Sequence, residues 1–252
     1  MLKSFKTLMQ IKDIPRKLLF SISYFIYVAS KRKIILFPPL TVLLYKYKFL
    51  CRSKTTDYWH VSKYFEPKTT NLLLKIKGDT FIDIGAHIGR YTILLSKNFK
   101  RIIAIEPVKD SFNVLRKNIL LNRLKNVKVI NFAIGEKERI TKIYINKENL
   151  GASSLIEKSK NCTEQKVKMI SLDKLIKSLK IKKIDVIKID VEGYELNVLK
   201  GAKKLLKKFR PLIIIEIRKK HKKKIEKILE DKYVIKKIEN HNFLLIPKKS
   251  KV

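Results

Sequence analysis

The stretch FIDIGAHIG, residues 81–89, gives the clearest indication of the fold. Its apolar first half predicts a short buried strand over 80–84, and the residues after it predict a helix over 89–97. Glycine allows the tight turn between two such elements, because it has no side chain to block the backbone or a nearby ligand. The chain has 252 residues but only seven glycines, so two glycines in this turn mark it as a candidate ligand-binding loop.

Apolar runs and amphipathic stretches alternate along the rest of the chain. Further strands are predicted over 101–105, 127–133, 184–189 and 212–217, and helices over 111–122, 191–209 and 219–231. Additional β structure is predicted over 139–146 and 166–171, and a C-terminal antiparallel hairpin over 233–235 and 243–246. Strands that alternate with helices favour a mostly parallel sheet with helices on both faces, so the predicted fold class is α/β.

An acidic residue follows the second of these strands. Glu106 lies 21 residues beyond Gly85, and a carboxylate in that place can accept hydrogen bonds from the hydroxyls of an adenosine ribose. Both NAD and S-adenosylmethionine contain this ribose. The loop from Gly85 to Gly89 is G-x-x-x-G and lacks the G-x-G-x-x-G of a pyrophosphate site. Asp83 would repel a pyrophosphate, so the residues favour S-adenosylmethionine, whose methionine part carries an amino group.

Several motifs in order resemble one family. They are FIDIGAHIGRYTILLSK, IIAIEP, VINFAIGEK, GASSL, ISLDKLI, IDVIKIDVEGYELNVLKGA and RPLIIIEI, over roughly 64 to 218. Together they resemble the FkbM-type S-adenosylmethionine-dependent methyltransferases. The resemblance implies a class I, Rossmann-like methyltransferase fold and methyl transfer to hydroxyls of sugars, polyketides or related metabolites. His87 stands where the family usually has asparagine.

The predicted cofactor site combines the resemblance with the strand ends. It comprises Asp83, Gly85, Ala86, His87, Gly89, Glu106, Pro107, Phe132, Ala133 and Asp173. Glu106 would bind the ribose, and Phe132 and Ala133 would lie beside the adenine. Three alternatives remain open: Asp83 as a helix cap, Phe132 as a core residue, and Asp173 as an acid in the first turn of a helix whose N-cap is Ser171.

The predicted catalytic residues are three acids. Asp190 and Glu192 follow the fourth parallel strand, and Glu216 lies in the very apolar run 212–217. A carboxylate there could take the proton of an acceptor hydroxyl, or help to hold a divalent ion. Asp190 could instead cap the helix over 191–209. The two cysteines and four histidines show no zinc-binding spacing, so no dedicated metal site is predicted.

The chain is strongly basic. It has 59 Lys and Arg against 22 Asp and Glu, which gives a net charge of +37. Only 10 of the basic residues are Arg, the side chain that nucleic-acid sites favour, so a solvated basic surface is the preferred interpretation. The alternatives are an RNA methyltransferase and a non-catalytic basic RNA-binding module. Against the first, the sequence after the fourth strand is Asp190-Val-Glu-Gly193, without an Asn/Asp-Pro-Pro-Tyr/Phe motif.

Residues 1–55 form a basic, apolar segment ahead of the methyltransferase domain predicted over 56–252. It has twelve basic residues and one acid. Its two uncharged runs, Leu18–Ser30 and Ile34–Tyr45, are each too short to span a bilayer. They are expected to form either two helices packed on the main domain or an anchor at an anionic membrane surface. The expected partner is a small-molecule, glycan or lipid-linked acceptor, and the expected location is the cytoplasm, with or without contact with the cytosolic membrane face.

Overall fold

A central seven-stranded sheet organises the computed structural model, which describes residues 14–30, 36–146, 153–156, 162–229 and 232–248. The strand order is β11-β12-β10-β9-β3-β4-β5. Five neighbouring strands are parallel, and β12 is antiparallel to both β10 and β11. Their bounds are β3 Gly78–Ile84, β4 Phe99–Ile105, β5 Val127–Ile130, β9 Val186–Ile189, β10 Leu212–Glu216, β11 Tyr233–Glu239 and β12 Asn242–Pro247. This confirms the predicted α/β fold with a C-terminal antiparallel hairpin.

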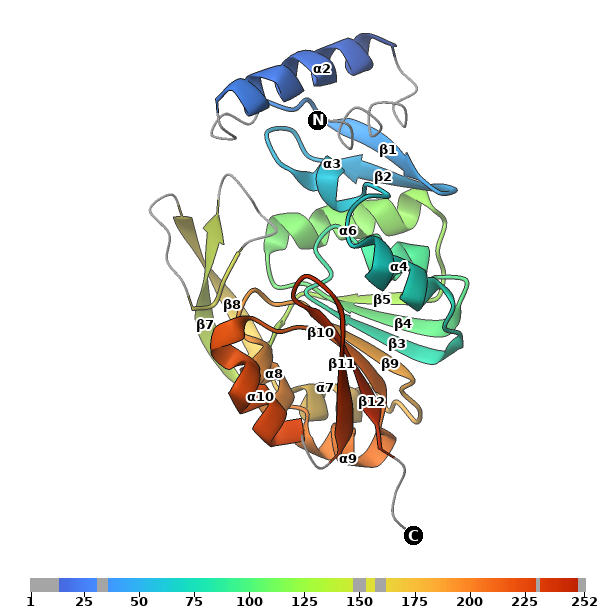
Figure 1. The fold of residues 1–252 in the computed structure, drawn as a ribbon, viewed down its shortest axis with the longest axis vertical. Coiled ribbons are helices and arrows are strands. Elements are labelled where there is room, and N and C mark those ends of the chain that lie inside the picture. Colours follow the sequence, from blue (N-terminus) through green and yellow to red (C-terminus); the bar gives the residue numbers. More distant parts are fainter. Residues whose placement is uncertain (1–13, 31–35, 147–152, 157–161, 230–231, 249–252) are drawn as a thin grey trace.

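Successive side chains of the sheet point to opposite faces, and helices cover both faces (Figure 1). One face, which includes Ile82 and Ile187, packs against four helices. These are α7 Leu172–Ser178, α8 Glu195–Lys200, α9 Lys203–Phe209 and α10 Lys222–Leu229. The other face, which includes Phe81 and Ala104, packs against α4 Pro67–Leu74, α5 Arg90–Leu94 and α6 Lys109–Leu121. Burial of these apolar side chains provides the main driving force for the fold.

Two predicted elements are divided in the structure. The helix predicted over 191–209 becomes α8 and α9, because the backbone of Gly201 passes against residue 135. A Cβ at Gly201 would lie 2.0 Å from the carbonyl oxygen of Gly135. The strand predicted over 127–133 ends at Ile130, and β6 (Ala133–Ile134) joins β7 (Arg139–Asn146) and β8 (Cys162–Ile170) in a small second sheet. The additional β structure was therefore predicted correctly.

The N-terminal segment is only partly helical, so the prediction for its second apolar run was wrong. α2 spans Ile14–Ala29, but the run over 34–45 leads into β1 (Leu40–Leu44), which pairs with β2 (Tyr47–Cys51). The pair Pro38-Pro39 prevents a helix from continuing here. In both strands, burial alternates along the chain as one face packs inward. Among the described residues, no helix has the length and apolar character needed to cross a bilayer.

The β1–β2 hairpin joins α2 to the main domain (Figure 1). On one side, Phe20 of α2 is fully buried against Phe37 and Tyr58. On the other side, α6 supplies hydrogen bonds to the edge of β2. Asn118 Oδ1 accepts from the backbone nitrogen of Leu50 at 2.7 Å, and Asn122 forms the equivalent bond with Lys48 at 2.9 Å. Two asparagines four residues apart lie on one helix face, so they satisfy a strand edge that would otherwise be unpaired.

Candidate active site

Two adjoining cavities lie where the parallel strands of the central sheet end. The larger cavity has a volume of about 380 Å³ and the smaller cavity about 50 Å³. Gly85, His87, Asp190 and Glu192 line both cavities, so they mark the junction between them. Doubly wound sheets bind their ligands at this carboxyl edge. The two cavities are therefore the candidate active site.

Most of the predicted site residues line these cavities. The larger cavity also receives Asp83, Ala86 and Glu216, and the smaller one receives Glu106, Pro107, Phe132 and Ala133. Gly89 and Asp173 line neither cavity, so the structure does not bring them together with the other predicted site residues. The carboxylate of Asp173 accepts hydrogen bonds from the backbone nitrogens of Lys204 and Leu205, at 3.0 and 2.7 Å. It therefore caps the first turn of α9, where backbone N–H groups have no partner within the helix.

The glycines of the loop after β3 have different roles. Gly85 has φ +81°, and a Cβ there would lie 1.8 Å from the carbonyl oxygen of Asp190. No other residue can fit between these two loops, so Gly85 brings them together at the junction of the cavities. Gly89 begins α5 with φ +97°, and a Cβ there would lie 2.5 Å from Leu115. Gly89 therefore allows close packing of α5 on α6 and does not contact the cavities.

Asp83 combines two of the roles considered from the sequence. Its Oδ2 accepts hydrogen bonds from the backbone nitrogen of Thr92 at 3.1 Å and from the Thr92 hydroxyl at 2.7 Å. This satisfies a free N–H in the first turn of α5, which is the capping role. The carboxylate is buried and also borders the larger cavity. Burial raises the pKa of Asp83, and the nearby Lys188 opposes this shift.

Glu106 is held in the loops around the smaller cavity. Its Oε2 accepts from the backbone nitrogen of His87 at 2.8 Å, and its Oε1 accepts from the backbone nitrogen of Val108 at 2.9 Å. Burial raises the pKa of Glu106 to about 7, although both hydrogen bonds favour the ionised form. Each carboxylate oxygen can accept a further hydrogen bond. Glu106 therefore has the remaining acceptor capacity that a ribose would need.

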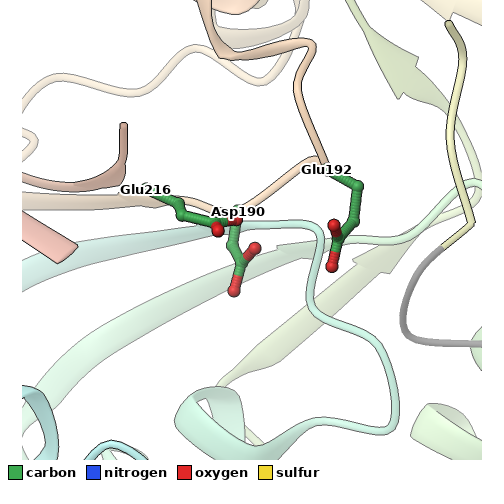
Figure 2. Close-up of side chains that lie close together, drawn as sticks. All are labelled: Asp190, Glu192 and Glu216. Carbon is green, nitrogen blue, oxygen red and sulfur yellow. The ribbon is translucent and has the colours of Figure 1, made fainter. Parts of the chain in front are cut away.

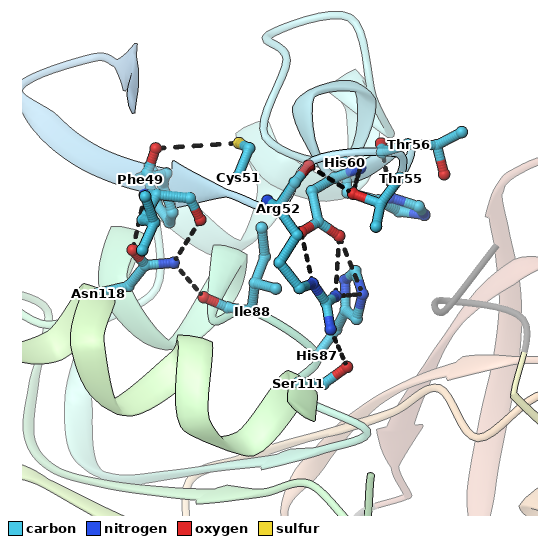
Figure 3. Close-up of polar contacts among 12 residues, drawn as sticks. Phe49, Cys51, Arg52, Thr55, Thr56, His60, His87, Ile88, Ser111 and Asn118 are labelled. Atoms are coloured by element: carbon cyan, nitrogen blue, oxygen red, sulfur yellow. Dashed lines mark hydrogen bonds and ion pairs between the residues drawn. The ribbon is translucent and has the colours of Figure 1, made fainter. Parts of the chain in front are cut away.

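His87 connects this loop to the N-terminal segment (Figure 3). Its backbone has φ +51°, a left-handed conformation that asparagine and histidine adopt more readily than most residues. Arg52 Nη2 lies 2.9 Å from His87 Nε2. Because arginine can only donate, His87 Nε2 accepts and the ring proton is on Nδ1. Burial, followed by the neighbouring His60, lowers the pKa of His87 to about 3, so the ring is neutral.

Arg52 is itself fixed by an ion pair that was not predicted from the sequence. Arg52 Nε and Nη2 donate to the two carboxylate oxygens of Asp57 at 2.8 and 2.9 Å, and Nη1 donates to the Ser111 hydroxyl at 3.0 Å. This two-point geometry is typical of strong arginine–carboxylate pairs. Arg52 and His87 are 35 residues apart in the sequence, and no motif links them. Only the folded hairpin shows that they meet.

The three predicted catalytic acids lie close together (Figure 2). Asp190 and Glu192 line both cavities, and Glu216 lines the larger one. One carboxylate oxygen from each of Asp190, Glu192 and Glu216 lies within 4.8 Å of the others. Glu192 has φ +51°, an uncommon backbone conformation for this residue type that is often found at functional sites. The structure therefore groups the acids that the sequence placed at the ends of two neighbouring strands.

Two of the three acids have a cationic partner. Lys188 Nζ lies 2.8 Å from Asp190 Oδ2, and Arg218 forms an ion pair with Glu192. Burial, followed by the charge of Asp190, raises the pKa of Glu192 to about 7 and that of Glu216 to about 8. Among the described ion pairs, none involves Glu216. Glu216 is therefore the acid in this group best suited to exchange a proton near neutral pH.

Lys188 is a site residue that the sequence analysis did not select. It is buried in the middle of β9, lines the larger cavity, and lies 4.8 Å above the ring of Tyr91. Burial alone would lower the pKa of Lys188, but the charges of Asp190 and Glu66 raise it well above its usual range. A lysine inside the apolar run of 184–189 was the available signal, because a buried lysine needs a counter-charge.

The strand order of the central sheet, with five parallel strands and an antiparallel β12, defines a class I, Rossmann-like methyltransferase fold. The position of the cavities at the carboxyl edge of the sheet agrees with this fold. Residues 83–245 match the family model of the methyltransferase FkbM domain. The chain therefore belongs to the FkbM methyltransferase family. This confirms both the family and the fold that the sequence motifs predicted.

Two curated relatives and one solved structure illustrate the similarity. The hexuronic acid methyltransferase AglP of Haloferax volcanii is 31% identical over 139 residues, which cover 55% of this chain and 56% of that protein. Methyltransferase sdnD of Sordaria araneosa is 26% identical over 153 residues, 48% of this chain and 59% of that protein. The crystal structure of methyltransferase FkbM from Methylobacillus flagellatus KT superposes with a TM-score of 0.48 at 19% identity, covering 67% of this chain and 43% of that one. The chain spans little more than half the length of each curated relative.

Proposed function

We propose that this protein transfers a methyl group from S-adenosylmethionine to a hydroxyl of a sugar, glycan or other hydroxylated metabolite. The observation that carries the proposal is the position of Asp190, Glu192 and Glu216 between the two cavities. These acids lie between the smaller cavity, which Glu106 lines, and the larger cavity. The similarity to a hexuronic acid methyltransferase supports a sugar as the acceptor.

The residues around the smaller cavity suit the nucleoside part of the cofactor. Glu106 would accept hydrogen bonds from the ribose, while Phe132 and Ala133 would flank the adenine. Gly85 and Ala86 would lie against the methionine part, with Asp83 behind them. The present volume of about 50 Å³ is smaller than a nucleoside requires, so the walls of this cavity would have to separate. When bound, S-adenosylmethionine supplies an electrophilic methyl group.

Glu216 is the proposed general base for the acceptor hydroxyl. Asp190 and Glu192 are each engaged by a cation, whereas Glu216 has a pKa of about 8 and lines the larger cavity. A base is most effective when its pKa lies near the working pH. Asp190 and Glu192 would hold the hydroxyl in position and keep the negative potential that favours proton uptake by Glu216.

Product chemistry tests this proposal. The protein should transfer a labelled methyl group from S-adenosylmethionine to members of a glycoside panel. We expect an alkali-stable product, because a methyl ether on a hydroxyl resists hydrolysis whereas a methyl ester on a carboxyl does not. An alkali-labile product would show methylation of a carboxyl group and would contradict the proposed O-methylation of hydroxyls.

The net charge leaves RNA as an alternative target or partner. An RNA methyltransferase or a basic RNA-binding module would bind RNA with an affinity that falls steeply as salt increases. We expect only weak binding without a defined site, because the basic residues are mostly lysines. Tight RNA binding together with methylated nucleotides as the product would favour the alternative.

We also propose that the outer face of α2 contacts an anionic membrane, which would bring the enzyme to lipid-linked acceptors. Leu19, Ile22, Phe25 and Val28 follow one another at intervals of three and are 44–73% exposed. Exposed apolar side chains in a segment with eleven more basic than acidic residues are typical of interfacial helices. This face lies opposite Phe20, which packs against Phe37 and Tyr58.

Vesicle flotation tests the membrane contact. The full chain should float with vesicles of phosphatidylglycerol and phosphatidylcholine, and much less with phosphatidylcholine alone. Phe25→Ser should reduce flotation several-fold. The matched control is Leu120→Ser on α6, because both side chains are 73% exposed. Equal loss in the two variants, or no flotation of the full chain, would contradict the membrane contact.

A further inference from the structure

The larger cavity has an acidic lining although the protein as a whole is very basic. Among the described residues that line it, five are acidic, namely Glu66, Asp83, Asp190, Glu192 and Glu216. Only Arg90 and Lys188 are basic. This excess of acids contrasts with a net charge of +37 for the chain. The surface charge therefore does not describe the environment that a substrate meets inside the cavity.

Neither cation of the lining is free to bind a negatively charged ligand. The Nζ of Lys188 contacts Asp190 at 2.8 Å. Arg90 Nη1 donates to the carbonyl oxygens of His60 and Ser62 at 2.8 and 2.9 Å, and Nη2 donates to the carbonyl oxygen of Phe65 at 2.9 Å. Arg90 thus holds the loop over 60–65 against the site. Arg90 Nε has no hydrogen-bond partner but is buried, so neither cation presents an accessible donor to a ligand.

His60 and His87, which also belong to the lining, do not supply positive charge near neutral pH. Burial lowers the pKa of His60, and the pKa of His87 falls to about 3. Both rings are therefore neutral.

Glu66 extends the negative charge away from the cofactor side. Its Oε2 accepts from the Tyr91 hydroxyl at 2.6 Å, and its Oε1 accepts from Asn242 Nδ2 at 2.8 Å. Both donors are neutral, so they orient the carboxylate without cancelling its charge. On the opposite wall, the raised pKa of Glu216, about 8, reflects burial and the neighbouring Asp190 and Glu192. Glu66 and Asp190 therefore supply negative charge near neutral pH, and Glu216 adds to it once it loses its proton above about pH 8.

We infer that the acceptor presents an uncharged or amino-bearing sugar ring to this cavity, and that uronates and phosphates are excluded. This inference rests on the proposed methyltransferase function. A carboxylate or phosphate on the ring would be placed among buried and half-buried carboxyl groups with no accessible cationic donor, at a high electrostatic and desolvation cost. Hydroxyls and ammonium groups could instead donate hydrogen bonds to Glu66 and Glu216. Trp59 and Tyr64 in the same lining provide surfaces for an apolar ring face.

The inference separates this protein from its relative that is named for hexuronic acid. The two chains share 31% identity over only 55% of this one, and Glu66 lies outside the residues that match the family model. Acceptor choice can differ while the fold and the cofactor loops stay the same. We therefore expect the acidic lining to set the acceptor charge independently of the shared domain.

The affinities of two cofactor analogues report the electrostatic potential at the junction of the cavities, and this measurement needs no known acceptor. S-Adenosylhomocysteine is uncharged where the methyl group is lost, whereas sinefungin carries an amine at that place. In calorimetric titrations of the full chain, we expect sinefungin to bind at least tenfold more tightly. At pH 8.5, above the pKa of about 8 of Glu216, Glu216→Gln should reduce this ratio at least threefold, because it removes a negative charge beside the junction. The control Glu226→Gln, on the outer helix α10 where Glu226 pairs with Lys222, should leave the ratio unchanged.

Matched glycosides then test the charge of the acceptor. We would compare 4-nitrophenyl glucoside, 2-amino-2-deoxyglucoside and glucuronide, and the corresponding galactose series, as acceptors of labelled methyl groups. The uronate of each series should react at least tenfold more slowly than its neutral partner. A uronate that reacts as fast or faster, or equal affinity for the two analogues, would overturn the inference. Binding of neither analogue would overturn the proposed function itself, and this inference with it.

Discussion

At the scale of single residues, the site depends on carboxyl groups whose surroundings move their pKa values in different directions. Lys188 stabilises the charge of Asp190, so the pKa of Asp190 falls despite the opposing effect of burial. Glu216, without such a partner among the described ion pairs, has its pKa raised to about 8. Neighbouring acids with separated pKa values can take different roles, one as a fixed charge and the other as a proton acceptor.

The first prediction concerns Glu216. Glu216→Gln should lower kcat at least 100-fold, because amide oxygen cannot take the hydroxyl proton. Binding of S-adenosylhomocysteine should change less than threefold. In the unsubstituted protein, kcat should rise with pH and level off above about pH 8, since the base must first lose its own proton. A pH-independent kcat, or an unchanged rate in the variant, would exclude Glu216 as the base.

The second prediction concerns Glu106 and stability. Its pKa is about 7 in the folded protein, compared with an ordinary value of 4.5 for glutamate. Between these values the folded state binds more protons than the unfolded state, so the contribution of Glu106 to stability is lost as pH rises from about 4.5 to about 7. Glu106→Gln should therefore make the free energy of unfolding less dependent on pH in this window. Urea unfolding at several pH values would show this, and an unchanged or steeper fall in the variant would contradict it.

At the scale of elements, the β1–β2 hairpin is part of the active-site architecture. It lies outside the residues that match the family model, but its end supplies Arg52, which contacts His87 in the loop after β3. The asparagines of α6 hold the same hairpin through the edge of β2. A segment that looked like an appendage in the sequence thus positions a loop that lines both cavities.

A double-mutant cycle tests this connection. Arg52→Met should weaken binding of S-adenosylhomocysteine about fivefold to tenfold, because His87 loses the donor that fixes its ring. In a His87→Asn background, the same Arg52→Met change should alter the affinity less than twofold. Thermal unfolding of all four proteins would measure the separate loss of the Arg52–Asp57 ion pair. An equal effect on affinity in both backgrounds would mean that Arg52 acts only through general stability.

The elements also show which features the sequence could predict. The apolar strands of the central sheet, Glu106 and the acids at the junction follow from local periodicity and from the rule that parallel strands end at one edge. The break at Gly201 could not be foreseen, because it depends on contact with Gly135. The capping role of Asp173 depends likewise on α9, which begins 30 residues later. Contacts between distant segments are not encoded in local patterns.

At the scale of the whole molecule, charge is distributed unequally between the surface and the site. Lysines give the chain its net charge of +37, whereas five acids against one arginine and one lysine line the larger cavity. The basic exterior would raise the rate of encounter with acidic surfaces, including anionic lipid. The acidic interior would favour a cationic cofactor and an acceptor without negative charge. The two regions therefore suit different partners.

The central claim is that the two cavities form a site for S-adenosylmethionine. Calorimetric titration of the full chain with S-adenosylhomocysteine, with NAD as a parallel ligand, tests it most directly. We predict binding of S-adenosylhomocysteine at one site and no binding of NAD. Glu106→Ala should abolish that binding, and the control Glu136→Ala, which removes an exposed acid that lines neither cavity, should preserve it. Binding of NAD, or no binding of S-adenosylhomocysteine, would contradict the account.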